Sequence, residues 1–395
     1  MRRRAATSHD DRMEEFRVAV PEDVLADLAD RLRRTRRPPA QTGPDGPPGA
    51  QPHEDPATLR RIDALIDRWR DGYDWRALER RINEFPQHRV TVDGVGLHVL
   101  RAPGAGPDPL PLLLLNGWPS SIIEYLDVLP RLADPAAYGG DPADSFTVVV
   151  PSMPGYGFSD RCLDRQPTRM WIAGLCHELM TTHLGHDRYV AHGDDIGAGV
   201  VNRLGLLAPP GLAAMQTANP IRPYLGDDPR LTPEEQAYAD ATARWDADHG
   251  AYAHVQATRP RILASALHDS PAGLASWILE KWLTWSDPAT RGRLTDDHLL
   301  GTVTLYWATE TVGSASRLYP PASAAPLEPG QRITVPTSVV IPHEPDLPPP
   351  PLSWLRRAYA DVRDLSALDA GGHFWAAETP DEFAGRIRAA FRPYR

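Results

Sequence analysis

Cysteine and long apolar runs are scarce in this chain of 395 residues, and each scarcity excludes a class of protein. Its two cysteines, Cys162 and Cys176, are too few for a disulfide framework or a cysteine-rich metal site. No stretch approaches the roughly 18 apolar residues of a membrane-spanning helix, and no apolar segment follows the basic start MRRRAATSHDDRMEEF. The net charge of -10 argues against a nucleic-acid partner. We therefore expect a soluble, cytoplasmic protein.

One further absence concerns chemistry. The stretch RYVAHGDDIGAGV, residues 188–200, is typical of a strand, a tight turn and a helix, the setting of the nucleophilic serine in G-x-S-x-G. No serine is present there. A sharp turn needs small residues two positions before and two after its exposed residue, and Gly193 and Gly197 flank Asp195 in this way. Asp195 is therefore the predicted nucleophile, although the pair Asp194-Asp195 could also serve only to cap the helix.

Apolar periodicity divides the chain into four parts. Residues 1–88 are expected to be mainly helical, and the proline-rich stretches 38–56 and 342–352 to be loops. Residues 89–222 begin with a hairpin around Asp93-Gly94 and continue with short apolar runs between helices, as in a buried parallel sheet. Residues 223–322 have only helical patterns, and strands return in 323–395. The order predicts an α/β protein with a helical insert.

Two later stretches place catalytic groups after strands, where ligands bind in α/β sheets. DAGGHF puts His373 behind two glycines, and VPTSVVIPHEPD puts Glu344 and Asp346 beyond another strand. The order nucleophile, acid, histidine is that of α/β-hydrolases. From the residues alone, either carboxylate could orient the histidine.

An aspartate nucleophile indicates alkyl rather than acyl chemistry. Its attack on an sp3 carbon forms an alkyl ester, which a histidine-activated water can hydrolyse at the carbonyl. Serine would form an ether that water does not readily cleave. Epoxide opening and dehalogenation are therefore the two reactions expected. Ester hydrolysis also needs an oxyanion hole, for which the backbone amides of Trp118, in LLLLNGWPSS, and Ile196 are the candidates.

Over nearly its whole length, the chain resembles the microsomal and juvenile-hormone type of epoxide hydrolase, in its soluble bacterial branch. The motifs that carry the resemblance are FRVAVPEDVLADLADRLRRTR, DWRALERRINEFPQHRV, NGWPSSIIEY, HGDDIG, YAHVQATRP, HDSPAGLASWILEKWLTW and TLYWATETVGSASRLY. The resemblance implies an α/β-hydrolase fold with an inserted helical cap and a helical lead-in segment that wraps over the catalytic domain. It assigns epoxide activation to Tyr252 and Tyr319, the relay acid to Glu344 and the base to His373.

The sequence departs from the family pattern at two positions near the site and in its N-terminal segment. Asn116 stands where histidine is frequent, and Ile196 where tryptophan often follows the nucleophile. No counterpart of the microsomal membrane helix is seen. Haloalkane dehalogenases share the aspartate but commonly need that tryptophan, and a non-catalytic binding protein of this fold would normally lack part of the catalytic set. Epoxide hydrolysis to a vicinal diol is therefore the preferred reading.

The resemblance implies no metal and no organic cofactor. Aromatic residues around the site favour a bulky or aromatic epoxide as substrate, and similar bacterial enzymes occur in natural-product pathways, including those of enediyne antibiotics. The residues expected to contact substrate are Trp118, Tyr306, Trp307, Phe374 and Trp375. The sequence leaves the oligomeric state open, with a homodimer among the options, together with the stereochemistry of the reaction.

Overall fold

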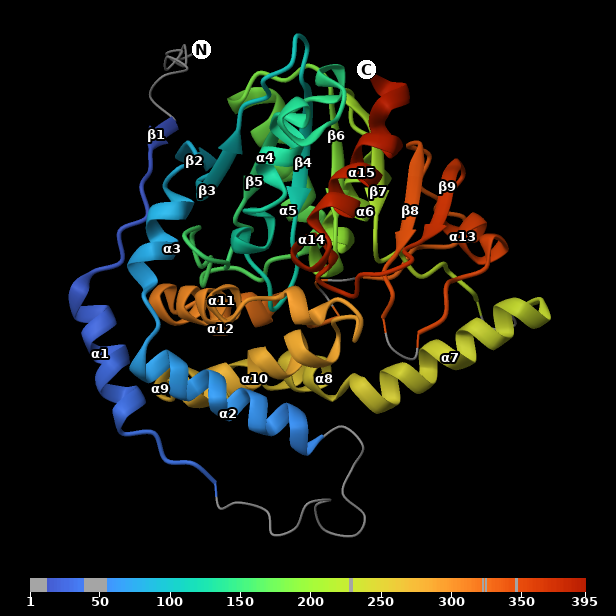
Figure 1. Cartoon of the computed structure of the whole chain (residues 1–395). Coiled ribbons are helices and arrows are strands. Elements are labelled where there is room, and N and C mark those ends of the chain that lie inside the picture. The colour runs from blue at the N-terminus through green and yellow to red at the C-terminus, as the bar shows by residue number, and fades with distance from the viewer. Residues whose placement is uncertain (1–12, 39–54, 227–229, 322, 324, 345–346) are drawn as a thin grey trace, which may run out of the picture.

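A mixed nine-stranded sheet forms the centre of the described structure (Figure 1). The computed structural model describes residues 13–38, 55–226, 230–321, 323, 325–344 and 347–395. The strand order is β1-β2-β3-β5-β4-β6-β7-β8-β9, antiparallel from β1 to β5 and parallel from β5 to β9. The strands are β1 (Met13–Glu15), β2 (Gln87–Val92), β3 (Val95–Ala102), β4 (Leu110–Leu115), β5 (Phe146–Pro151), β6 (Tyr189–Gly193), β7 (Leu212–Thr217), β8 (Thr337–Ile341) and β9 (Val362–Ala367).

Helices cover both faces of the sheet, which explains the unbroken apolar runs of its central strands. Leu113 and Leu115 of β4 pack in a cluster with residues of α5 and α6. The alternate residues Leu112 and Leu114 pack with residues of α4 and α15 on the other face. The helices of the sheet domain are α4 (Leu129–Ala133), α5 (Arg169–Glu178), α6 (Asp195–Leu207), α13 (Leu352–Ala358), α14 (Trp375–Glu378) and α15 (Pro380–Phe391).

Local sequence explains two features of the chain: the hairpin turn that the sequence predicted, and a break between two short helical segments near Pro130. Asp93 and Gly94 both have positive φ, 47° and 77°, as a two-residue hairpin turn requires. The segment before and around Pro130 is split into a 3-10 turn, η2 (Ile122–Tyr125), and the short α4. Pro130 lacks an amide donor and is tolerated only in the first turn, so α4 begins just before it.

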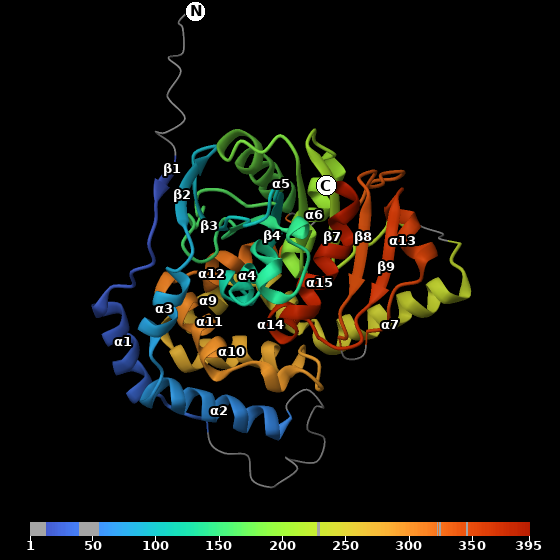
Figure 2. The ribbon, with the colours of Figure 1, turned by 45° about the horizontal axis from the view of Figure 1, so that its top comes forward.

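The N-terminal segment is mainly helical, as predicted, with α1 (Glu22–Arg33), α2 (Pro56–Asp71) and α3 (Trp75–Ile82). It also supplies the edge strand β1, whose three residues are too few to show a period. Asp55 caps α2 by accepting from the amides of Ala57 and Thr58. Most of the proline-rich stretch 38–56 lies outside the described residues. Figures 1 and 2 show α1 and α2 along the outer side of the inserted helices.

The insert between β7 and β8 forms a helical cap over the carboxyl ends of the parallel strands (Figure 1). No strand occurs in the described part of the cap, in agreement with its periodicity. None of the helices in the described part of the chain combines the length and apolar character needed to cross a membrane. The cap helices are α7 (Pro233–His249), α8 (Ala251–Thr258), α9 (Pro260–Asp269), α10 (Pro271–Thr284), α11 (Asp296–Thr309) and α12 (Val312–Ala315).

Candidate active site

Asp195 lies at the sharp turn between β6 and α6. Its φ of 50° is a strained backbone conformation for a residue with a side chain. A Cβ on Gly193 would lie 2.5 Å from the carbonyl carbon of Gly197, and one on Gly197 would lie 2.1 Å from the Leu115 oxygen. No larger residue therefore fits at either glycine, which is the register that identified Asp195 from the sequence.

A histidine and a glutamate approach Asp195 from the ends of β9 and β8. The Nδ1 of His373 donates to Oε1 of Glu344 over 2.7 Å, and its Nε2 lies 3.9 Å from Oδ2 of Asp195. Burial lowers the pKa of His373, but the charge and hydrogen bond of Glu344, with the charges of Asp195 and Glu124, outweigh burial and raise it to about 9. The other predicted acid, Asp346, lies outside the described residues.

Two cap tyrosines meet above Asp195. Tyr252, on α8, and Tyr319, just after the 3-10 turn η7 (Ser316–Leu318), have ring centroids 5.7 Å apart. The ring of Trp118 stacks on Tyr252 at 5.5 Å and meets the edge of Tyr319 at 5.9 Å. Burial raises the pKa of both phenols, and the nearby charge of Asp195 raises it further. Both hydroxyls therefore stay protonated at neutral pH.

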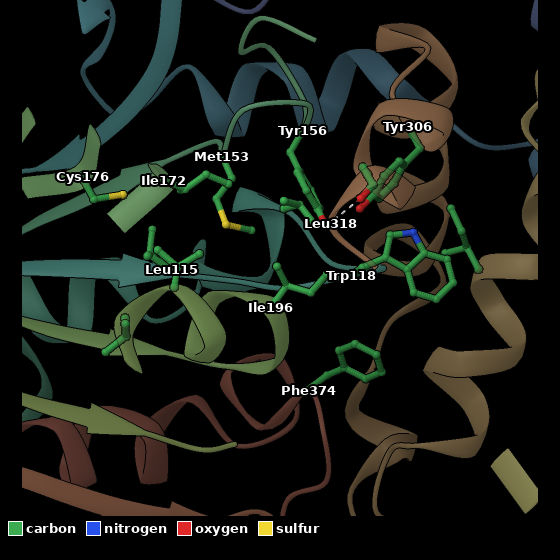
Figure 3. Packing of buried hydrophobic residues seen from close by; sticks show 14 of the residues in the cluster. Leu115, Trp118, Met153, Tyr156, Ile172, Cys176, Ile196, Tyr306, Leu318 and Phe374 are labelled. Atoms are coloured by element: carbon green, nitrogen blue, oxygen red, sulfur yellow. Dashed lines mark hydrogen bonds between the residues drawn. The ribbon is translucent and has the colours of Figure 1, made fainter. Parts of the chain in front are cut away.

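A backbone donor faces one oxygen of Asp195. The amide of Trp118 donates to Oδ1 of Asp195 over 2.9 Å. The amide of Ile196 belongs to the first turn of α6, whose amides have no acceptor within the helix. Figure 3 shows Trp118 and Ile196 in one buried cluster with Tyr306 and Phe374. The carboxylate thus has one oxygen, Oδ1, bound to the oxyanion turn and the other, Oδ2, on the side of His373.

A cavity of about 710 Å³ opens onto these groups. Asp195, Tyr252, Glu344 and His373 all line it. Within the described residues, no cluster of three or more His, Cys, Asp or Glu side chains could hold a metal ion. The other aromatic residues in the cavity wall are Tyr224, Tyr238, Trp245, Trp285 and Trp354.

The chain is similar to known proteins over most of its length. A family model described as "Epoxide hydrolase N terminus" matches residues 13–125, from β1 to the end of η2. A putative epoxide hydrolase of Stigmatella aurantiaca (strain DW4/3-1) is 38% identical over 384 residues, which are 96% of this chain and 85% of the relative. The chain belongs to the epoxide hydrolase family.

Solved structures of related epoxide hydrolases have the same fold. An enantioselective mutant of the Aspergillus niger epoxide hydrolase superposes with a TM-score of 0.81 at 28% identity, covering 98% of this chain and 97% of that one. The juvenile hormone epoxide hydrolase of Bombyx mori gives a TM-score of 0.78 at 26% identity, covering 98% and 96%. The fold is therefore that of α/β-hydrolases, and the protein is an enzyme that acts on epoxides.

The residues that we expected to contact substrate need correction, because none of them lines the cavity of this epoxide hydrolase. Trp118 is fully buried behind the two tyrosines. Tyr306 is also buried, and its hydroxyl donates to the Ser120 carbonyl over 3.0 Å. Trp307 faces away from Asp195, into a separate hollow beside α1, where the Arg31 guanidinium lies 5.7 Å from its ring.

Phe374 and Trp375 are likewise structural. Phe374 stacks on Trp282 at 3.7 Å, and Trp375 is buried with its indole nitrogen 2.9 Å from Asp194 Oδ1. Phe374 and Trp375 come directly after His373 in the chain, but their side chains point into the core while the imidazole of His373 faces the cavity. The aromatic wall of the cavity instead comes largely from α7 and the loop before it, where the sequence showed no motif.

Two buried carboxylates hold the loop that carries His373, residues 371–374 (the histidine loop), and the sequence did not identify them. Glu378 is fully buried and accepts from the amides of Gly372 and Phe374 over 3.1 and 3.2 Å. Asp287, in the cap between α10 and α11, accepts from the amide of Gly371 over 3.0 Å. Glu378 is near enough in sequence to His373 to have been suspected. Nothing in the sequence connects Asp287 to this loop.

Proposed function

We propose that the protein opens an epoxide to a vicinal diol through a covalent ester on Asp195. Oδ2 of Asp195 attacks one carbon of the epoxide ring while Tyr252 and Tyr319 donate hydrogen bonds to the ring oxygen. The carbon–oxygen bond of the ring breaks, and the alkoxide takes a proton from one phenol. The acidity of a phenol suits this task, since it is protonated at neutral pH yet stabilises developing negative charge.

Water completes the reaction in a second step. His373, oriented by Glu344, takes a proton from a water molecule that attacks the carbonyl carbon of the ester. The amides of Trp118 and Ile196 stabilise the oxyanion, which collapses to release the diol and the Asp195 carboxylate. The proton taken up by His373 then passes through solvent to the phenolate that the first step left, which restores the free enzyme. Esterification removes the charge of Asp195 that helps to raise the pKa of His373. The imidazole therefore loses its proton more readily when it is needed as a base.

The observation that carries the proposal is the convergence on one carboxylate. Asp195, at a strained turn, has the His373–Glu344 pair 3.9 Å away on one side and the Trp118 amide on the other, beneath two phenols. A serine-type hydrolase needs neither the carboxylate nor the phenols. Membership of the epoxide hydrolase family supports the same reaction.

The cavity favours a bulky substrate. The cavity has a volume of about 710 Å³ and five aromatic residues in its wall besides Tyr252. This volume is within the range of pockets that bind drug-sized ligands. A small alkyl epoxide would leave much of this space filled with water. We propose an aryl or polycyclic epoxide, of the kind formed in natural-product biosynthesis.

Isotope labelling tests the covalent step. During single turnover of styrene oxide or stilbene oxide in heavy-oxygen water, the attacking water oxygen enters the carboxylate and the diol oxygen comes from Asp195. Mass spectrometry of the peptide that contains residues 194–195 should find label on Asp195. Asp195→Ala should form no adduct with either epoxide. Label on Asp194, or on neither residue during diol formation, would contradict the proposed mechanism.

A further inference from the structure

A second buried carboxylate lies directly beside the nucleophile. Asp194 is 4% exposed, and the mechanism proposed above does not use it. Its Oδ1 accepts from Nε1 of Trp375 over 2.9 Å, and its Oδ2 from Nε2 of His192 over 3.0 Å. The hydroxyl of Tyr125 donates to Oδ2 over 3.4 Å. A buried carboxylate is costly unless it is paired, so these contacts explain how Asp194 can be retained there.

The three donors come from three different segments. His192 is on β6, which leads into the nucleophile turn; Tyr125 is on η2, which follows the oxyanion turn; and Trp375 begins α14, just after His373. Asp194 therefore joins the nucleophile turn to both other parts of the site. The bond to Trp375 is the direct link between the turn that carries Asp195 and the loop that carries the base.

The Trp375 side chain is held firmly in place by its neighbours, so its hydrogen bond can fix the histidine loop relative to Asp194. It is fully buried, with its ring centroid 4.4 Å from that of Phe383 and 5.8 Å from that of His192. The neighbouring Glu124 is also buried, and one of its carboxyl oxygens has no hydrogen-bond partner. Burial, with the charge of Asp194, raises the pKa of Glu124 to about 8. Glu124 therefore keeps its proton to a higher pH than an exposed glutamate does.

We propose that Asp194 and Trp375 are positioning residues that set the distance between Asp195 and His373 for hydrolysis of the ester. This inference rests on the proposed covalent mechanism. The second step requires a water molecule aligned between the imidazole and the ester carbonyl, and such steps lose about 100-fold in rate for a misplacement of roughly 1 Å. The first step depends on the two cap tyrosines, which this hydrogen bond does not touch, and on Asp195, which keeps its contact with the Trp118 amide when the bond is lost. The bond should therefore act on hydrolysis and not on alkylation.

Trp375→Phe tests the inference, because it keeps an aromatic ring in the core and removes the donor. We expect ester hydrolysis to slow by about 10- to 100-fold while alkylation stays near the wild-type rate. The ester then accumulates, so kcat and KM fall by a similar factor and kcat/KM is unchanged. Stopped-flow fluorescence with styrene oxide, and the intact mass of the quenched enzyme, measure the two steps separately.

Trp69→Phe is the matched control. Trp69 is buried on α2, and its Nε1 donates to Oγ1 of Thr304 over 2.9 Å, so the variant loses a hydrogen bond of the same length far from the histidine loop. It should lower the Tm, as Trp375→Phe does, but leave the two rates in their wild-type ratio. A general loss of stability would instead affect both variants alike.

A second substitution covers the case in which Trp375→Phe does not fold. Replacement of Trp375 by benzothienylalanine keeps the shape of the indole and exchanges only the N–H for sulfur. Wild-type hydrolysis rates in either folded variant would overturn the inference. If the wild-type enzyme itself forms no ester, the covalent mechanism is wrong and the inference falls with it; if the wild-type ester forms and only the variants hydrolyse it normally, the inference alone is wrong.

Discussion

The histidine loop beneath the cavity and the cap above it are held by different interactions. The loop, residues 371–374, is tied by buried hydrogen bonds to Glu378 and Asp287, and its continuation at Trp375 to Asp194. The cap packs on the lead-in helices through buried apolar side chains and the Trp69–Thr304 hydrogen bond, and the outer margin of this contact carries exposed ion pairs. Arg61 of α2 pairs with Asp296 of α11, with side chains 41% and 30% exposed.

The difference corresponds to what each part has to do. Hydrogen bonds in a water-free interior fix their partners closely, because an unmade bond there is costly. Exposed ion pairs are worth little and are screened by salt, so they fix a position only loosely. We infer that the loop provides a constant geometry for the base. The ion pairs at the outer margin of the cap leave that margin room for adjustment to a bulky substrate.

Removal of the base should have the largest effect. In His373→Gln, Asp195 can still be alkylated, but no group remains to activate water. General-base catalysis contributes about 100- to 10,000-fold, so we expect kcat to fall by about that factor and the ester to persist. The intact mass of the variant should increase by one substrate equivalent. Normal turnover by this variant would place the base elsewhere.

Loss of the Tyr252 and Tyr319 hydroxyls should affect the first chemical step, the alkylation of Asp195. In the double variant Tyr252→Phe/Tyr319→Phe, no donor remains for the epoxide oxygen, so we expect alkylation to be abolished. Each single variant should keep residual alkylation, and ester hydrolysis should be nearly unchanged in both. Tyr238→Phe, in the wall of the same cavity, is the control and should alkylate normally. Near wild-type alkylation by the double variant, followed by stopped flow, would rule out this role.

Sequence patterns located the side chains that meet at Asp195 better than the residues that support them. Asp195 was predictable because a sharp turn tolerates only glycine at positions 193 and 197. His373 and Glu344 were predictable because each follows a strand, in the chain order of α/β-hydrolases. These are local constraints, which a single stretch of sequence can express. The resemblance alone pointed to Tyr252 and Tyr319, since no local pattern separates them from other cap tyrosines.

The direction in which buried side chains face could not be predicted from local patterns. Helix α11 is buried at every position from Leu299 to Trp307, so its periodicity cannot indicate which side faces Asp195. Trp307 was therefore assigned to substrate binding although it faces α1. The bond between Trp375 and Asp194 joins residues 181 positions apart, and only the folded chain brings them together. Asp194 was accordingly considered only as a rival nucleophile or a helix cap.

The pH dependence distinguishes the free enzyme from the ester. In the free enzyme the pKa of His373 is raised to about 9, partly by the charge of Asp195. Hydrolysis needs the neutral imidazole, so its rate should rise with pH. Because the ester has no charge on Asp195, the midpoint should lie below 9. Single-turnover decay of the ester between about pH 5.5 and 9.5 measures it, and a midpoint at or above that of the free enzyme would contradict the coupling.

The smallest effect should come from the ion pairs of the cap. Arg61→Gln removes the contact with Asp296 in the first turn of α11. Because exposed pairs contribute little, we expect the Tm to fall by no more than about 2 °C, and the difference to vanish in about 1 M salt. Turnover of styrene oxide should be unchanged, since no hydrogen bond of the histidine loop is altered.

Arg81→Gln provides the comparison that makes this last effect specific to the cap. Arg81 is similarly exposed, at 42%, and its partner Asp127 belongs to the core side of the molecule. Hydrogen exchange should become faster at the start of α11 in Arg61→Gln and not in Arg81→Gln, because only the first loosens the cap. Faster exchange in the histidine loop of Arg61→Gln would show that cap and loop are coupled. The contrast between a fixed base and an adjustable cap would then be wrong.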